Sequence, residues 1–308
     1  MAEPLRIKGV LAPVLTPVQS DASPDVARLI GHCKWLLGQH CGLAVFGTNS
    51  EANSFSVHER LAVLDALVGG GIDPTRMMPG TGCCALPDTI QLTSQALKLS
   101  CAGVLMLPPF YYKGVSDEGL YRYFSEVVQR IGDARLRIYL YHTPPVSQVP
   151  LTLPLIERLI KAYPGTVVGM KDSSGDWTHT KAVLDAFGNS GFDVFAGTEA
   201  LLLATMRHGG AGCISATANI NAAAIDHLYR EWRNADAEAQ QRALDRLRST
   251  VANYPMIAAL KQTVAHYAGD PGWTRMRPPL LELTTEQAKN LVADLAGLGF
   301  AMPGLRST

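Results

Sequence analysis

Two residues with reactive side chains, Lys171 and Tyr141, lie near the ends of short apolar segments that are typical of buried strands. The segments are TVVGMKD (166–172) and RIYLYHTP (137–144). Side chains alternate between the two faces of a strand, so Lys171 takes the face opposite the apolar Val168 and Met170. If that apolar pair faces covering helices, Lys171 points inward. Partial desolvation there favours a neutral, nucleophilic amine, which attacks carbonyl carbons.

Strand position alone favours neither of two interpretations of Lys171 over the other. One is a nucleophile for covalent catalysis, and the other is a structural ion pair with Asp172 or Glu199 at the rim of the sheet. Tyr141, nearest the end of its own strand, can present its hydroxyl in the same cavity. Without Lys171, the preferred interpretation is an ordinary core tyrosine bound to the backbone.

The elements that carry these residues alternate along the chain. Eight short apolar segments are candidate strands: 9–17, 42–48, 77–82, 103–109, 137–144, 166–172, 193–199 and 212–217. Between them lie segments with helical spacing, among them 25–40, 56–68, 86–99 and 117–131. Ser56 and Glu59 have the spacing of a capping box at the start of one of these helices. This alternation predicts a (β/α)8 TIM barrel.

The predicted barrel spans residues 1–224, and a C-terminal helical extension packed on it spans 225–308. The extension follows from four further helical segments at 221–235, 237–254, 256–268 and 285–299, which are more than one barrel helix needs. A doubly wound open sheet is the alternative. It usually has a glycine-rich nucleotide loop after its first strand, and LTPVQSDASPD is not one.

In a barrel the chemistry lies at the C-terminal ends of the strands, which directs attention to two loops. The loop FGTNSEANSFS contains Gly47, Thr48, Asn49 and Ser50, whose hydroxyl, amide and backbone N–H groups can hold a carboxylate. The segment HGGAGCISATAN (208–219) is rich in glycine. Its glycines suit either a phosphate or the close approach of a neighbouring backbone.

Composition excludes several classes of protein. The 308 residues are 47% hydrophobic and 18% charged, and 27 Lys and Arg balance 27 Asp and Glu. This balance favours a small-molecule partner over nucleic acid or a membrane surface. The N-terminal segment is too broken by Pro13 and Pro17 for a signal peptide, so we expect a cytoplasmic location. Six scattered cysteines without CxxC, and the lack of HExxH and GxSxG, argue against a metal site, disulfides or a serine triad.

Taken together, the chain resembles the dihydrodipicolinate synthase and N-acetylneuraminate lyase superfamily of class I aldolases, which form Schiff bases with pyruvate-type substrates. The resemblance covers almost the whole chain. It is carried by six motifs in the family's order: GVLAPVLTP (9–17), GTNSE (47–51), PPFYY (108–112), YHTP (141–144), GMKDSSG (169–175) and GGAGCISATAN (209–219).

The resemblance implies roles for individual residues. Lys171 corresponds to the Schiff-base lysine, Tyr141 to the proton shuttle and Thr48 to the hydroxyl relay. The backbone N–H groups of Thr48 and Asn49 correspond to the holder of the substrate carboxylate. Tyr111 corresponds to the tyrosine that enters a neighbouring subunit's site, with Tyr112 as the competing assignment.

Further positions line the expected substrate pocket. Gly197 and Ile214 correspond to residues of the pyruvate pocket, while Ser173 and Glu199 are candidates for binding the distal hydroxyls of the substrate. The resemblance also implies a homotetramer, a dimer of dimers, that uses no metal or organic cofactor.

Two positions depart from the family. Val146 stands where the synthases have an arginine that binds the carboxylate of aspartate semialdehyde. Ser50 replaces a glycine of the carboxylate loop. If Ser50 has a positive φ, we expect strain of about 1 kcal/mol or more in that loop.

These observations predict a lyase that acts on a 2-oxo acid through a lysine Schiff base. The main hypothesis is a pyruvate aldolase of the 2-keto-3-deoxy sugar acid type, because Ser147 and Gln148 beside Val146 suit a neutral, hydroxylated reactant. The alternatives are a dehydratase of such acids and 4-hydroxy-tetrahydrodipicolinate synthase, which Val146 disfavours. Hypotheses of another class are a non-catalytic binder of 2-oxo acids and a barrel enzyme for phosphorylated sugars that uses the glycine-rich segment.

Overall fold

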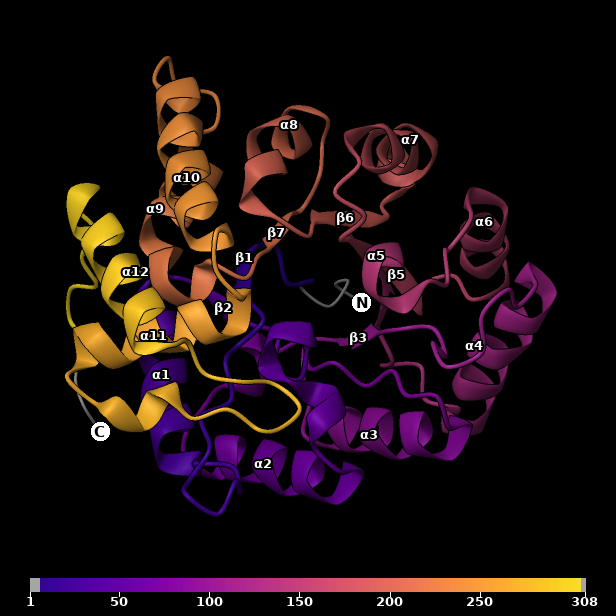
Figure 1. Cartoon of the computed structure of the whole chain (residues 1–308). Coiled ribbons are helices and arrows are strands. Elements are labelled where there is room, and N and C mark those ends of the chain that lie inside the picture. Colours follow the sequence, from indigo (N-terminus) through magenta and orange to yellow (C-terminus); the bar gives the residue numbers. More distant parts are fainter. Residues whose placement is uncertain (1–5, 306–308) are drawn as a thin grey trace. The chain divides into compact units, whose positions relative to one another are not determined.

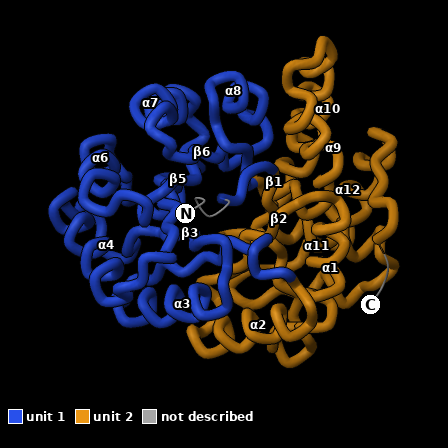
Figure 2. Tube along the Cα trace, turned by 180° about the vertical axis from the view of Figure 1, so that it is seen from behind, with its two compact units in different colours: residues 1–9, 73–214 blue, residues 10–72, 215–308 orange. Residues whose placement is uncertain are grey.

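Parallel strands alternate with helices along the chain, as the apolar pattern predicts (Figure 1). The computed structural model describes residues 6–305. Two units are distinguished within the chain (Figure 2). Unit 1 runs up to Gly9 and continues over Asp73–Ile214, and unit 2 consists of Val10–Ile72 and the chain from Ser215 onward.

Five strands of unit 1 pair in parallel, each with the next one along the chain. They are β3 (Val104–Met106), β4 (Ile138–His142), β5 (Val167–Asp172), β6 (Asp193–Ala196) and β7 (Gly212–Ile214). All their residues are buried. Continuous burial of both faces is what parallel strands covered by helices require.

The predicted strand at 77–82 is wrong. In its place Gly80 forms an isolated bridge to Leu105, flanked by hydrogen bonds from Leu105 N to Pro79 O and from Thr81 N to Leu105 O. Pro79 has no N–H to continue a ladder, and glycines weaken strands. The segment MMPGTG therefore has the hydrophobicity of a strand but not its hydrogen-bonding capacity.

Except for the four-residue α5 (Pro144–Ser147), which follows β4 directly, the helices of unit 1 lie outside this series of strands (Figure 1). The helices predicted at 86–99 and 117–131 are confirmed as α3 and α4. The full set is α3 (Leu86–Lys98), α4 (Asp117–Ile131), α5 (Pro144–Ser147), α6 (Leu153–Ala162), α7 (Trp177–Phe187) and α8 (Leu202–Arg207), with the 3-10 turns η3 (Pro74–Arg76), η4 (Gly188–Ser190) and η5 (Glu199–Leu201).

Unit 2 joins an N-terminal segment to the C-terminal helices. Strand β1 (Gly9–Ala12), which starts at the end of unit 1, pairs in parallel with β2 (Gly42–Leu43). Helices α1 (Val26–Gly38) and α2 (Val57–Gly69) match their predictions, and the capping box of Ser56 and Glu59 is present. Between them lie the 3-10 turns η1 (Thr48–Ser50) and η2 (Ala52–Ser54).

The four helices expected in the C-terminal region are also present. They are α9 (Ala218–Glu231), α10 (Ala237–Ala252), α11 (Met256–Ala268) and α12 (Thr285–Gly297), with η6 (Pro271–Thr274) after α11. The predicted boundary at 224/225 falls inside α9. Apolar side chains of α10, α11 and α12 form one buried cluster with Leu15 and Trp273. Within residues 6–305, no helix is both long and apolar enough to cross a membrane.

The glycine-rich segment at 209–219 is explained by close packing within unit 1. The Gly9 N–H donates to Ala211 O at 2.8 Å. Gly212 has φ 139°, and a Cβ added there would lie 2.0 Å from Gly9 O. Only glycine permits this approach. Of the two interpretations of the segment, the structure favours backbone packing over a phosphate cradle.

A fully buried ion pair stabilises unit 2. The Lys261 ammonium on α11 pairs with the Glu51 carboxylate, which follows η1, and also donates to Arg275 O at 3.0 Å. Burial lowers the pKa of Lys261, while Glu51 opposes that change. A charge left alone in such a place is costly, so each partner depends on the other.

Replacing Lys261 with methionine is expected to lower the free energy of unfolding by about 3–5 kcal/mol, because the Glu51 carboxylate would stay buried without its cation. Urea denaturation followed by circular dichroism measures the change. Lys161→Met is the matched control, because Lys161 forms an exposed pair with Glu157 and such pairs contribute about 0–1 kcal/mol. Equal effects of the two substitutions would contradict the assignment.

Candidate active site

Lys171 and Tyr141 lie opposite each other on two adjacent parallel strands. The register of β4 and β5 pairs Tyr141 with Lys171. Lys171 Nζ donates to Tyr141 Oη at 3.4 Å and lies 4.4 Å from the centre of the Tyr141 ring. The side chains are only 2% and 4% exposed. The structure therefore brings together the two residues that the sequence singles out first.

Gly169, two residues before Lys171, makes room for another ring. A Cβ added at Gly169 would lie 2.7 Å from the Tyr139 ring and 2.4 Å from Asp193 O. Tyr139 packs edge to face against Phe195. The rings of Tyr139 and Phe195 therefore fill the space at Gly169. Lys171 and Tyr141 are each two residues nearer the C-terminal end of their strand, on the same face as Gly169 and Tyr139.

The Asp172 carboxylate is engaged away from Lys171. It accepts hydrogen bonds from His179 Nδ1 at 2.9 Å, from Thr180 Oγ1 at 2.7 Å and from Ser174 N at 2.9 Å. Burial acts to raise the pKa of Asp172, but these hydrogen bonds outweigh it and hold the pKa below its usual range. The alternative of an ion pair between Asp172 and Lys171 is therefore wrong, because alternation along β5 sends the two side chains to opposite faces.

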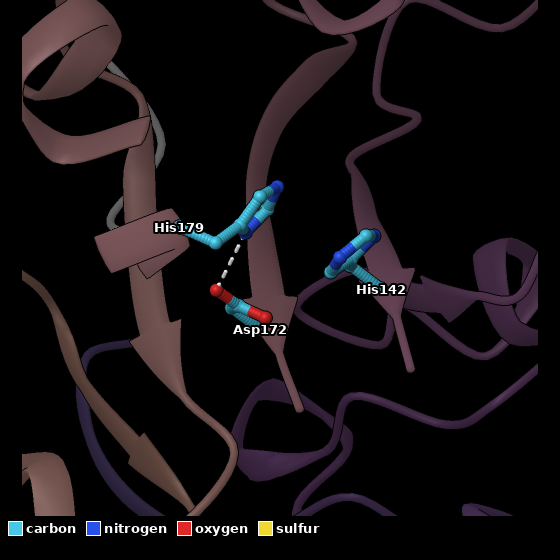
Figure 3. Close-up of side chains that lie close together, drawn as sticks. All are labelled: His142, Asp172 and His179. Carbon is cyan, nitrogen blue, oxygen red and sulfur yellow. Dashed lines mark hydrogen bonds and ion pairs between the residues drawn. The ribbon is translucent and has the colours of Figure 1, made fainter. Parts of the chain in front are cut away.

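Two histidines that are not among the predicted site residues complete the surroundings of Asp172 (Figure 3). The rings of His142 and His179 are stacked, with centres 4.2 Å apart and planes 12° apart. His142 Nδ1 accepts the backbone N–H of Leu151 at 3.0 Å. The signal available in the sequence was the position of His142 directly after Tyr141. The structure adds that His142 pairs with Asp172 in the strand register.

The two histidines have opposite electrostatic preferences. Burial lowers the pKa of His142 to about 4, and the neighbouring His179 adds to this effect. The hydrogen bond with Asp172 raises the pKa of His179 above its usual value, although burial opposes it. The stack therefore favours one neutral and one charged ring.

This cluster also has the composition of a metal site. Ligand atoms of His142, Asp172 and His179 lie within 4.8 Å of one another. A backbone N–H is always a donor, so His142 Nδ1 must supply the lone pair and Nε2 must carry the proton of the neutral ring. Neither nitrogen then offers a free lone pair to a cation. The donor set fits a hydrogen-bonded network better than a metal.

Four predicted binding residues lie at or just after the ends of β5, β6 and β7. Ser173 and Gly197 are in contact, since a Cβ added at Gly197 would lie 2.1 Å from Ser173 Oγ. Gly197 N donates to Asp172 O at 2.6 Å. Glu199 is buried in η5, and Ile214 is buried at the end of β7. Ser173 and Gly197 are thus brought together, each just after the end of its strand.

The loop after β3 carries the two candidate tyrosines. Tyr111 and Tyr112 are 74% and 71% exposed and pack edge to face against each other. The Lys113 ammonium donates to Phe110 O and to Ser147 O, which links this loop to α5. Val146, also in α5, is 63% exposed. The two exposed fractions are too similar to decide which of the two tyrosines corresponds to the one that enters a neighbouring subunit's site.

Thr48 and Asn49 belong to unit 2, where they form the turn η1 with Ser50. Ser50 Oγ accepts the Gly47 N–H at 3.1 Å, and Thr16 Oγ1 donates to Ser50 O at 2.8 Å. The expected strain at Ser50 is not found, because the left-handed residues of this loop are Phe46, with φ 60°, and Glu51, with φ 58°. The serine hydroxyl instead closes the turn.

Comparison with known proteins places this arrangement in context. The model of the Dihydrodipicolinate synthetase family matches residues 6–297. An uncharacterized DapA-like lyase of Chloroflexus aurantiacus is 33% identical over 300 residues, which cover 95% of this chain and 96% of the relative.

Two solved structures have the same fold over almost the whole chain. The crystal structure of dihydrodipicolinate synthase from Agrobacterium tumefaciens superimposes with a TM-score of 0.87 at 32% identity, over 95% of this chain and 99% of that one. YagE of E. coli K12, solved in complex with pyruvate, gives 0.88 at 24% identity, over 96% and 99%. The predicted fold class, an α/β barrel of the (β/α)8 type with C-terminal helices, is confirmed by this likeness.

The histidine stack predicts two separate titrations, measurable by NMR of the imidazole signals. We expect His142 to protonate near pH 4 and His179 above its ordinary value of 6.5. Asp172→Asn is expected to lower the pKa of His179, because the negative partner is lost. Asp185→Asn, which removes an exposed carboxylate of the same helix, is the control. A His179 pKa that stays unchanged in Asp172→Asn would contradict this electrostatic assignment.

Proposed function

This chain belongs to the dihydrodipicolinate synthetase family and is a class I lyase, and on that premise we propose that it acts on a 2-oxo acid through a Schiff base on Lys171. The observation that carries the proposal is the buried contact between Lys171 Nζ and Tyr141 Oη. An amine that faces a phenol has a proton acceptor and donor at the place where an imine must form.

The proposed reaction begins with attack of the neutral Lys171 amine on the 2-oxo carbon. Loss of water from the carbinolamine gives an iminium, whose positive charge accepts the electron pair released when the C3–C4 bond breaks. Tyr141 is proposed to give and take the protons of carbinolamine collapse and of the departing aldehyde oxygen. Protonation at C3 and hydrolysis of the iminium then release pyruvate and free Lys171.

Residues of the carboxylate loop enter the proposal by resemblance. Thr48 is proposed to relay protons to and from Tyr141, and the backbone N–H groups of Thr48 and Asn49 to hold the substrate carboxylate. Gly197 and Ile214 are proposed to line the pocket, and Ser173 and Glu199 to bind distal hydroxyls. The homotetramer, and the entry of Tyr111 or Tyr112 into a neighbouring subunit's site, stay predictions.

We propose a 2-keto-3-deoxy sugar acid as the substrate, cleaved in the aldolase direction. Val146 offers no charge to a second carboxylate, and the nearby Lys113 ammonium is held by two backbone carbonyls. A neutral, hydroxylated aldehyde suits such surroundings better than aspartate semialdehyde. Dehydration of the same acids is the alternative reaction. The likeness to the Agrobacterium enzyme supports the synthase as a further alternative.

Borohydride trapping tests the Schiff base. Incubation with pyruvate and reduction is expected to leave one carboxyethyl group, located on Lys171 by peptide mass spectrometry. Lys171→Arg should abolish the adduct, whereas Lys161→Arg, at an exposed lysine, should retain it. Tyr141→Phe should slow adduct formation by about 10²–10⁴-fold, as loss of a general acid or base does. An adduct on another lysine, or none, would refute the mechanism.

A substrate panel tests the second half of the reaction. Pyruvate release from 2-keto-3-deoxy sugar acids is expected to exceed condensation of pyruvate with aspartate semialdehyde. Val146→Arg should raise the condensation activity by about 10–10²-fold, because an ionic hydrogen bond to the second carboxylate contributes about 1.5–3 kcal/mol. Condensation as the sole activity of the unmodified protein would refute the assignment. Trapping of pyruvate with no turnover of any panel substrate would instead indicate a 2-oxo acid binder.

A further inference from the structure

The loop at 143–150, here called the 143–150 loop, begins two residues after Tyr141 and contains the exposed Val146. Its two ends are tied together by the hydrogen bond from Leu151 N to His142 Nδ1. Inside the loop, Ser147 Oγ donates to Thr143 O at 3.0 Å and accepts from Val149 N at 3.3 Å. The shape of the loop therefore depends on where the His142 ring is held.

His179 contacts that ring. It stacks on His142 at 4.2 Å, and its own ring is fixed by the hydrogen bond to Asp172 (Figure 3). Thr180, the next residue of α7, binds the same carboxylate oxygen of Asp172. A continuous series of contacts thus runs from β5 through α7 to the base of the 143–150 loop.

We infer that the stacked His142 and His179, anchored by Asp172, position the 143–150 loop for the second reactant, so that His179 is a positioning residue that acts through His142. This inference rests on the proposed function, because that function assigns the surroundings of Val146 to the aldehyde. Lys171 and Tyr141 point to the other face of the same strand ends, so formation of the Schiff base does not depend on the stack.

The charges around the stack make the positioning sensitive to pH. His142 faces His179 and Asp172, while His179 faces Asp172 and is also influenced by Asp176 and by the backbone of Leu151. Protonation of His142 would place an N–H of the ring against the Leu151 N–H and a cation against charged His179. Folding lowers the pKa of His142, so the neutral ring contributes fully to the stability of this arrangement above pH 6.5. This stabilisation is lost as the pH falls towards about 4.

The experiment compares His179→Ala, His179→Gln and Lys181→Ala. Lys181 lies on the same helix in an exposed pair, so its variant controls for a general effect on α7. Three quantities are measured in each variant: pyruvate trapping at Lys171, the KM and kcat for the sugar acid, and hydrogen exchange of peptides covering 143–151.

For His179→Ala we expect about a 10-fold rise in KM with a smaller change in kcat, and faster exchange confined to 143–151. A 10-fold change corresponds to about 1.4 kcal/mol, which is the order of the net contribution of one hydrogen bond. Trapping of pyruvate should stay within about two-fold. His179→Gln, which can still donate to Asp172, should recover part of the effect, and the Lys181 variant should resemble the unmodified protein.

The inference is overturned if His179→Ala leaves both KM and exchange of 143–151 unchanged, or if exchange rises equally throughout unit 1. Failure of the proposed function has a different signature. In that case the unmodified protein traps no pyruvate, while the exchange measurement still reports whether His179 holds the 143–150 loop.

Discussion

Parallel pairing of β4 with β5 is the constraint on which the candidate site depends. One register places Tyr141 beside Lys171 and, one residue on, His142 beside Asp172. Because successive side chains alternate between faces, these two neighbouring pairs build two separate networks. One is an amine with a phenol, and the other is a carboxylate with two imidazoles. A slip of one residue would exchange their faces and destroy both networks.

The two buried lysines Lys261 and Lys171 have different partners, and their expected roles differ accordingly. Lys261 meets a carboxylate and a backbone carbonyl, which compensate its charge and make it part of the framework of unit 2. Lys171 meets the hydroxyl and ring face of Tyr141. The carboxylate makes Lys261 half of a structural ion pair, whereas the Lys171 amine lies beside a hydroxyl, a group that can exchange protons with it.

The stack of His142 on His179 adds a feature that the family motifs do not indicate. His142, within the motif YHTP, accepts the backbone N–H of Leu151 at the far end of the loop through its Nδ1. A second ring on α7 then supports the first. This network connects the base of the 143–150 loop to α7 and to Asp172, beside the residues proposed for chemistry.

Local patterns in the sequence were sufficient for most elements and for the direction of Lys171. Periodicity predicts α1 to α4 and α9 to α12, since amphipathic spacing and capping are local properties, and alternation along 166–172 predicts that Lys171 and Met170 take opposite faces. The tertiary structure decided what local patterns do not encode. Asp172 binds His179, Gly212 contacts Gly9, and the segment 77–82 forms an isolated bridge instead of a strand. The left-handed residues of the carboxylate loop are Phe46 and Glu51, not Ser50. Each of these outcomes depends on a contact between separate elements or on the closing of a turn, and hydrophobic periodicity carries no information about either.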